Sequence, residues 1–338
     1  MWQFEGLENL DQAIQYLQEV QPIHTEVEWN DAPLSAQVRF LPNFPFNNPE
    51  EIDIDGTNIR YIAVECSTER SRSQEFWYNN QGDFKDRNDR INLYQSKLIL
   101  FESNNNVHGI VFTGLTRART ILRDCLPENP WGTINPYEFE VTEDLLYWLF
   151  RKFIDLRDTP LSANHNMFVT ALKSYTGKTR DNVNAMRGNG RRISTILGTL
   201  AFLFNNENLK AVRPQIQYNG EVFLIEISLS RTCRIWEEEY QGNWLLVDDE
   251  RKVNNIAIYT YLILLPRLIE CYRDNIVRGQ WSPQQKVEFL QRLGNEIKDQ
   301  VEAELQRLQV EMEAAADIQD DGIEPNDLFD IDETEDME

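Results

Sequence analysis

The fold class is decided by residues 215–227, which read QIQYNGEVFLIEI. Apolar and polar side chains alternate on both sides of Asn219-Gly220, a dipeptide that favours a two-residue type I′ turn. The stretch therefore predicts a β-hairpin. Apolar segments typical of buried helices flank it at residues 193–206 and 254–276. A hairpin inserted among helices predicts an α+β fold.

The N-terminal part, residues 1–140, is rich in short strand patterns and predicts a domain with a small mixed or antiparallel sheet and one helix. The helix is the amphipathic segment 6–20. The strands that we predict are Ala36–Phe40, Ile59–Cys66, Lys97–Glu102 and Gly109–Thr113. The polar segment 67–90 predicts a long loop or a hairpin excursion, anchored by the aromatic side chains of Phe76, Trp77 and Tyr78.

The C-terminal part, residues 141–316, predicts a mostly helical domain with the hairpin near 215–227 inserted in it. Thr142 is a typical N-cap for an apolar helix that follows it. Residues 168–175 also favour a helix, and Trp244–Val247 favours a strand. Pro266 lies inside the apolar segment 254–276, where a proline predicts a kink.

A long terminal helix is predicted from Pro283 to about Ala316, because Ser282-Pro283 is typical of a helix start. Its apolar stripe only partly follows a heptad pattern, so we favour a helix docked on its own domain over a dimeric coiled coil. The stripe consists of Val287, Leu290, Ile297, Val301, Leu305, Leu308 and Met312.

The charge is strongly acidic and unevenly distributed. The formal net charge is -23 and the pI is about 4.6. No Lys or Arg follows Arg307, and residues 317–338 predict a disordered acidic tail. This tail is either a solubilising extension or a mimic of nucleic acid that shields a basic surface or binds a basic partner.

One basic segment interrupts this acidity, between residues 173 and 192. Guanidinium and ammonium groups on a glycine-rich backbone predict a surface that contacts phosphate or nucleic acid, with a solvated loop as the alternative. Its cations are Lys173, Lys178, Arg180, Arg187, Arg191 and Arg192. A second candidate anion site is formed by Arg117 and Arg119, with Arg123, near the start of a predicted helix at residue 115.

The motifs of common enzymes are incomplete. Gly177-Lys178-Thr179 resembles the end of a phosphate-binding loop, but Leu172 stands where that loop requires glycine. Single carboxylates on predicted strands, namely Glu65, Glu102 and Glu226, leave a metal-dependent nuclease as the alternative function, although none is followed by the expected lysine. Neither the three histidines nor the four cysteines have metal-ligand spacing, so we expect free thiols, no metal and no cofactor.

These observations predict a non-enzymatic interaction or regulatory protein. We expect it to be a component of a bacterial multi-protein system. Residues 1–5 do not resemble a secretory signal, and no apolar stretch approaches the length of a membrane span, so we expect a cytoplasmic location and no membrane partner. A protein partner is expected, with nucleic-acid phosphate as a second ligand. The catalytic residues, the oligomeric state and the identity of the partner stay open.

Overall fold

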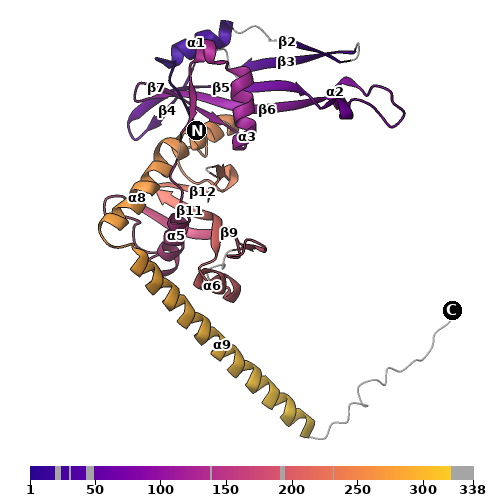
Figure 1. The fold of residues 1–338 in the computed structure, drawn as a ribbon. Coiled ribbons are helices and arrows are strands. Elements are labelled where there is room, and N and C mark those ends of the chain that lie inside the picture. Colours follow the sequence, from indigo (N-terminus) through magenta and orange to yellow (C-terminus); the bar gives the residue numbers. More distant parts are fainter. Residues whose placement is uncertain are drawn as a thin grey trace, which may run out of the picture.

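The computed structural model describes residues 1–19, 24–29, 32–42, 49–137, 139–190, 195–230 and 232–320. Two antiparallel sheets lie one above the other and a long C-terminal helix extends away from them (Figure 1). Helices pack against both sheets. The predicted α+β class with a long terminal helix is therefore confirmed.

The first sheet has the strand order β2-β3-β5-β6-β7-β1-β8, and β4 pairs with β5 at its side. All of its pairings are antiparallel, which settles the alternative left open by the sequence. The strands are β1 (Trp2–Phe4), β2 (His24–Trp29), β3 (Ala32–Pro42), β4 (Glu50–Ile54), β5 (Thr57–Ser71), β6 (Ile91–Ser103), β7 (Asn106–Val111) and β8 (Ile134–Pro136).

Two amphipathic helices, α1 (Leu10–Glu19) and α3 (Leu115–Cys125), share a hydrophobic core with the first sheet. The connection between β5 and β6 contains the short helices η1 (Gln74–Phe76) and α2 (Arg87–Arg90), and α4 (Glu128–Trp131) precedes β8. Trp77 anchors this connection as predicted: it is fully buried and its indole nitrogen donates to the Arg72 carbonyl oxygen at 2.9 Å.

The C-terminal half contains a complete five-stranded sheet where the sequence predicts a single hairpin. Its order is β10-β9-β11-β12-β13, and the predicted turn at Asn219-Gly220 joins β11 to β12 with positive φ at both residues. The strands are β9 (Met167–Lys178), β10 (Ala185–Asn189), β11 (Asn208–Tyr218), β12 (Glu221–Ser228) and β13 (Cys233–Ile235).

The helix predicted at residues 168–175 is wrong, because this segment belongs to β9. Register shifts between β9 and β11 interrupt the alternation of inward and outward side chains. Met167, Val169, Leu172 and Tyr175 are buried as a result, and their spacing imitates that of a helix. The strand predicted at Trp244–Val247 is also wrong, because those residues form turns.

The helices of the second half follow the predicted apolar segments. The Thr142 side chain caps α5 (Glu143–Asp155) by accepting from the Leu145 backbone nitrogen at 3.2 Å. The segment around Pro266 is a continuous helical run with a π-helical turn just before the proline, which accommodates its missing N–H group. The remaining elements are α6 (Leu197–Phe204), η3 (Glu237–Glu239), α7 (Asp249–Tyr259), the π-turn η4 (Thr260–Leu264) and α8 (Leu265–Val277).

The largest hydrophobic core contains side chains from both sides of residue 140. Phe101 of the first sheet belongs to it together with Phe150 of α5 and Ile258 of α7. The four cysteines are free thiols, as predicted, and three of them are buried. Among the described helices, none combines the length and the apolar character that crossing a membrane requires.

The terminal helix α9 (Pro283–Asp320) begins at the predicted cap, where the Ser282 hydroxyl accepts from the Gln285 backbone nitrogen at 3.3 Å. It continues to Asp320, so the first four residues of the predicted tail are helical. The remainder of the predicted tail, residues 321–338, lies outside the described residues.

Candidate interaction site: a basic sheet face and a projecting helix

The predicted basic segment lies on the β9–β10 hairpin. Ala185 lies opposite Lys178 in the register, and Arg187 follows two residues later, so Lys178 and Arg187 are on the same face of the sheet. Both side chains are exposed, whereas Lys173 is half-buried. Arg180 lies in the connecting turn, and its backbone nitrogen donates to the Glu207 carboxylate at 2.6 Å. Arg191 and Arg192 lie outside the described residues.

Two further arginines, missed by the sequence analysis, lie on the same sheet face. Arg213 of β11 pairs in register with Ser174, and Arg234 of β13 pairs with Glu226. The Arg213 guanidinium lies 3.3 Å from the Glu226 carboxylate and 3.7 Å from the centre of the Trp236 ring. The alternation of apolar and polar residues along β11 could have revealed Arg213 as a residue of this face. The predicted hairpin began at Gln215, however, and so excluded it.

The three strand carboxylates do not form one site. Glu102 accepts from the Leu10 backbone nitrogen at 3.1 Å, at the start of α1, and Glu226 belongs to the other sheet. Glu65 lies opposite Lys97 in the β5–β6 register, four positions along β5 from Tyr61, which is opposite Phe101. Within the described ranges, no group of three or more His, Cys, Asp or Glu residues is arranged to hold a metal ion.

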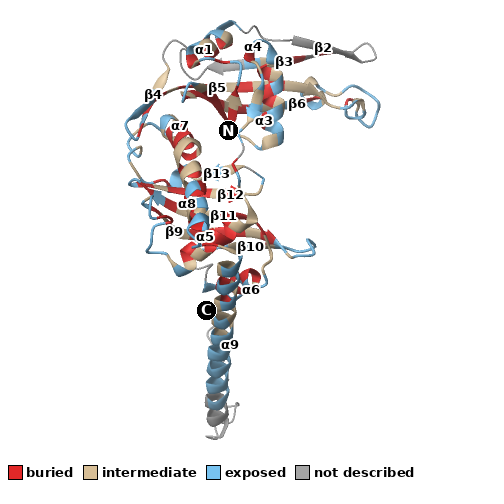
Figure 2. Ribbon diagram, turned by 60° about the vertical axis from the view of Figure 1, so that its left-hand side comes forward, coloured by how far each residue is buried: buried red, intermediate tan, exposed pale blue. Residues whose placement is uncertain are grey.

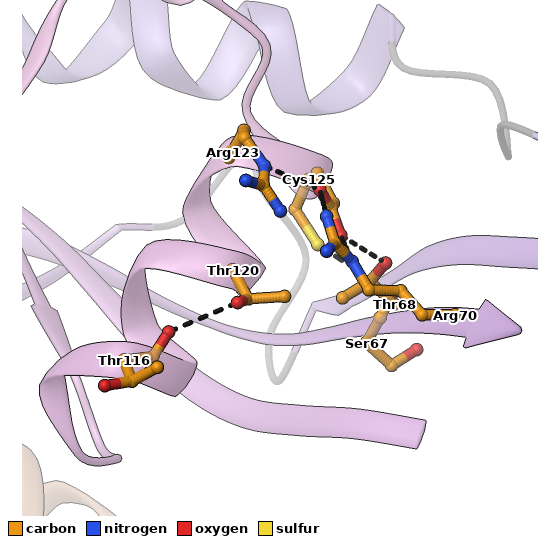
Figure 3. A network of polar contacts seen from close by, with 8 residues as sticks. Ser67, Thr68, Arg70, Thr116, Thr120, Arg123 and Cys125 are labelled. Carbon is orange, nitrogen blue, oxygen red and sulfur yellow. Dashed lines mark hydrogen bonds and ion pairs between the residues drawn. The ribbon is translucent and has the colours of Figure 1, made fainter. Parts of the chain in front are cut away.

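The second predicted anion site separates into two parts. Arg119 lines a cavity of about 480 Å³, which Arg117 does not line, as expected for residues two positions apart on a helix. Arg123 pairs with Asp124 at 3.2 Å, and Asp124 also pairs with Arg70 at 2.7 Å and accepts from Thr68 at 3.3 Å. Figure 3 shows Arg123, Arg70 and Thr68 gathered between the end of α3 and β5. The contacts of Asp124 with Arg70 and Thr68 of β5 therefore help to hold α3 on the first sheet, whereas the Arg123–Asp124 pair lies within α3.

Burial alone would raise the pKa of Asp124, but hydrogen bonds and charge attraction from Arg70 and Arg123 outweigh it and lower that pKa. The carboxylate therefore stays ionised down to acidic pH. Elsewhere in Figure 3, the Thr120 hydroxyl donates to the Thr116 carbonyl oxygen at 3.2 Å. These contacts are consistent with a structural role for this face of α3.

The cavity lined by Arg119 lies where the two sheets meet. Residues of β1, β7 and α3 line one side, and residues of β12, β13 and α7 line the other. Arg234 also lines it, so the structure brings one predicted cation and one that was missed to the same cavity. Glu226 and Glu237 are present in the lining as well, which leaves the cavity with both signs of charge.

The long helix α9 has a docked half and a projecting half. Phe289 and Leu293 are buried against the body, and Arg292 forms an ion pair with Asp155 of α5. From Val301 to Glu313 every side chain is exposed (Figure 2). The predicted docking thus describes the first half of the helix only.

The projecting half carries four apolar residues in heptad spacing. Val301, Leu305, Leu308 and Met312 follow one another at intervals of four, three and four residues, and their exposed fractions are 40%, 59%, 43% and 73%. In heptad notation they occupy positions d, a, d and a, the positions that form the seam between two helices of a coiled coil.

Neither a scan against protein-family models nor a search of curated protein sequences returns a match for this chain.

Proposed function

We propose that this chain is a non-enzymatic interaction protein that binds a helical segment of a partner protein through the projecting half of α9. The exposed heptad stripe of Val301, Leu305, Leu308 and Met312 is the observation that carries this proposal. Apolar side chains in the a and d positions gain stability when a second helix covers them. On α9 these side chains are exposed to solvent instead.

Charge favours a basic partner over a second copy of the chain. The positions that flank the stripe are acidic or neutral: Glu304 and Glu311 at g, and Glu302 and Gln309 at e. Arg307 is at position c and bridges Glu304 and Glu311 within the helix, at 2.5 Å each. A second copy would therefore gain no ion pair across the seam, whereas Lys or Arg at the partner's e and g positions would.

The test uses a synthetic helix of about four heptads with Leu at a and d and Lys at e and g. We expect the full chain to bind it, and a peptide with Glu at e and g to bind far more weakly. Leu305→Ala with Leu308→Ala should weaken binding by more than about tenfold, because two apolar side chains leave the seam. Val310→Ala is the matched control, since Val310 is exposed but lies off the stripe.

Binding would be measured by isothermal titration calorimetry and the oligomeric state by light scattering. Equal loss of affinity in Val310→Ala, or no binding of the basic peptide, would contradict the proposal. A stable dimer of the free chain that Leu305→Ala with Leu308→Ala disrupts would identify a second copy as the occupant instead.

The basic face of the second sheet favours a second function, contact with a phosphate-bearing polymer such as single-stranded nucleic acid. The supporting observation is the register that places Lys178, Arg187, Arg213 and Arg234 on one face, with Trp236 stacked beneath Arg213. Cations with an interleaved aromatic ring suit a strand of phosphates and bases.

Fluorescence anisotropy with a labelled oligonucleotide tests this second function. Lys178→Gln with Arg187→Gln should weaken binding and reduce its salt dependence, because fewer counterions are released. Lys298→Gln, an exposed cation on α9, is the control. Removal of residues 321–338 should strengthen binding at low salt if the acidic end of the chain competes for this face. Binding that is unchanged in the double variant would remove this face from consideration.

A further inference from the structure

A second cavity of about 500 Å³ lies between the tips of two hairpins, one from each sheet. The β4–β5 hairpin contributes Glu51, Asp53 and Asp55 to its lining, and the β11–β12 hairpin contributes Asn219 and Glu221. The Asn219 amide donates to the Asp55 carboxylate at 3.2 Å, which joins the two tips. The cavity is distinct from α9 and from the basic sheet face.

Glu221 is the buried carboxylate of this cavity, with only 4% of its surface exposed. It accepts hydrogen bonds from the Tyr240 hydroxyl and from the Asn243 amide, the latter at 2.7 Å. Among the described residues no Lys, Arg or His side chain lies within ion-pair distance of it. A buried carboxylate without a neighbouring cation carries a large desolvation cost, and a bound cation would offset that cost.

Tyr259 lines the same cavity and its hydroxyl forms no hydrogen bond of normal geometry with the described part of the chain. Its side chain is 97% buried, since only 3% is exposed. Burial, followed by the nearby charge of Asp55, raises the Tyr259 pKa, with a small opposing effect from the Asn219 amide. The buried hydroxyl is therefore neutral and leaves its lone pairs for a ligand.

Aromatic rings complete the lining. The Trp244 ring lies edge-on to Tyr259, with centroids 5.5 Å apart, and stacks on Tyr240 at 5.6 Å. Aromatic faces beside carboxylates attract organic cations. Arg251 also lines the cavity, but its guanidinium is held by Glu50 at 2.9 Å.

We propose that this cavity binds an organic cation, a guanidinium or primary ammonium group, between Glu221 and the rings of Trp244 and Tyr259. The volume exceeds that of a bare metal ion, and the acidic residues described around it do not form a metal-binding group. The cation belongs either to a free small molecule or to an arginine or lysine side chain of a partner, because both present the same chemistry to Glu221.

Isothermal titration calorimetry of the full chain with agmatine, with an acetylated arginine amide, and with Mg²⁺ tests the proposal. We expect binding of agmatine or of the arginine amide. Glu221→Gln should weaken it by more than about tenfold, because the ion pair is lost. Tyr259→Phe, which removes only the hydroxyl, should weaken it by a smaller factor. Glu238→Gln, an exposed glutamate in η3, is the matched control and should leave affinity unchanged.

Thermal melts of each variant establish that it is folded, and agmatine should raise the melting temperature of the native chain but not of Glu221→Gln. A stronger signal with the arginine amide than with agmatine would indicate a partner's side chain as the source. The proposal is overturned if Mg²⁺ binds and neither organic cation does, or if neither organic cation binds at all. If Glu221→Gln is unfolded, the proposal is overturned when Tyr259→Phe binds the organic cation as tightly as the native protein does.

Discussion

Lys152 of α5 shows how burial changes the chemistry of a single side chain. Only 7% of it is exposed, and its ammonium lies 6.0 Å from the centre of the Trp148 ring. Burial, followed by repulsion from Arg151, lowers its pKa to about 8. An unfolded lysine has a pKa of about 10.4, so folding at neutral pH places a charge where it is poorly solvated.

Replacing this lysine with methionine should stabilise the protein. Between pH 8 and about 10.4 the unfolded chain binds a proton that the folded chain does not, so native stability rises with pH in that window. Below pH 8 the lysine is charged in both the folded and the unfolded chain, so the free energy of unfolding is reduced by the full cost of burying that charge. We therefore expect Lys152→Met to be more stable than the native chain by about 1–3 kcal/mol at pH 7, with the difference shrinking towards pH 10.

Urea denaturation of both proteins at pH 7 and pH 10 measures this difference. Lys298→Met, at an exposed position of α9, is the control and should change stability little at either pH. A Lys152→Met variant that is less stable than the native chain at pH 7 would show that packing of the lysine stem outweighs the buried charge.

The packing of α6 on the second sheet depends on Gly177, a residue whose neighbours in the sequence suggest a different role. Gly177 resembles part of a phosphate-binding loop in the sequence, but in the structure it lies within β9 beneath the Phe202 ring of α6. A side chain here would overlap that ring and lie 2.9 Å from the Asn208 carbonyl oxygen. The glycine thus allows the helix to approach the strand closely.

Gly177→Ala should destabilise the protein by about 1–3 kcal/mol, because the added methyl group must displace Phe202 or the β11 backbone. Gly198→Ala, on α6 itself, is the matched control: nothing lies near the added group, and helix propensity should improve stability slightly. Thermal or urea denaturation distinguishes the two. If both variants behave alike, the close approach of Phe202 to β9 is not what limits this position.

The body and the projecting helix differ in how they contribute to stability. The largest core draws on both sides of residue 140, so the two sheets are joined by shared apolar packing. Within α9, Phe289 and Leu293 belong to that core, whereas the side chains from Val301 to Glu313 are exposed. The helix is therefore part of the body for its first turns and a separate surface afterwards.

Truncations should separate these two roles. A chain ending at Gln300 should melt within about 2 °C of the full chain, since every side chain from Val301 to Glu313 is exposed. A chain ending at Ser282 loses Phe289 and Leu293, each worth about 1.5–3 kcal/mol of burial, and should melt about 10 °C lower or more. Circular dichroism melts provide the measurement. A large loss of stability in the chain ending at Gln300 would mean that the projecting half contacts the body in solution.

The sequence by itself determined the features that depend on neighbouring residues. The type I′ turn at Asn219-Gly220, the Thr142 cap, the start of α9 at Pro283 and the buried anchor Trp77 all follow from local conformational preference and apolar periodicity. The α+β class follows from the same patterns.

Only the tertiary structure decided what depends on pairing between distant strands. The register shifts between β9 and β11 break the alternation of apolar and polar side chains along β9, so the sequence does not show that β9 is a strand. The second sheet and its basic face could therefore not be inferred from residues 173–192 alone. The cavity of Glu221 and Tyr259 requires two hairpin tips that are more than 160 residues apart in the chain, since Asp55 meets Asn219 there. The heptad stripe of α9 was visible in the sequence, but its exposure was not, because burial is a property of the assembled fold.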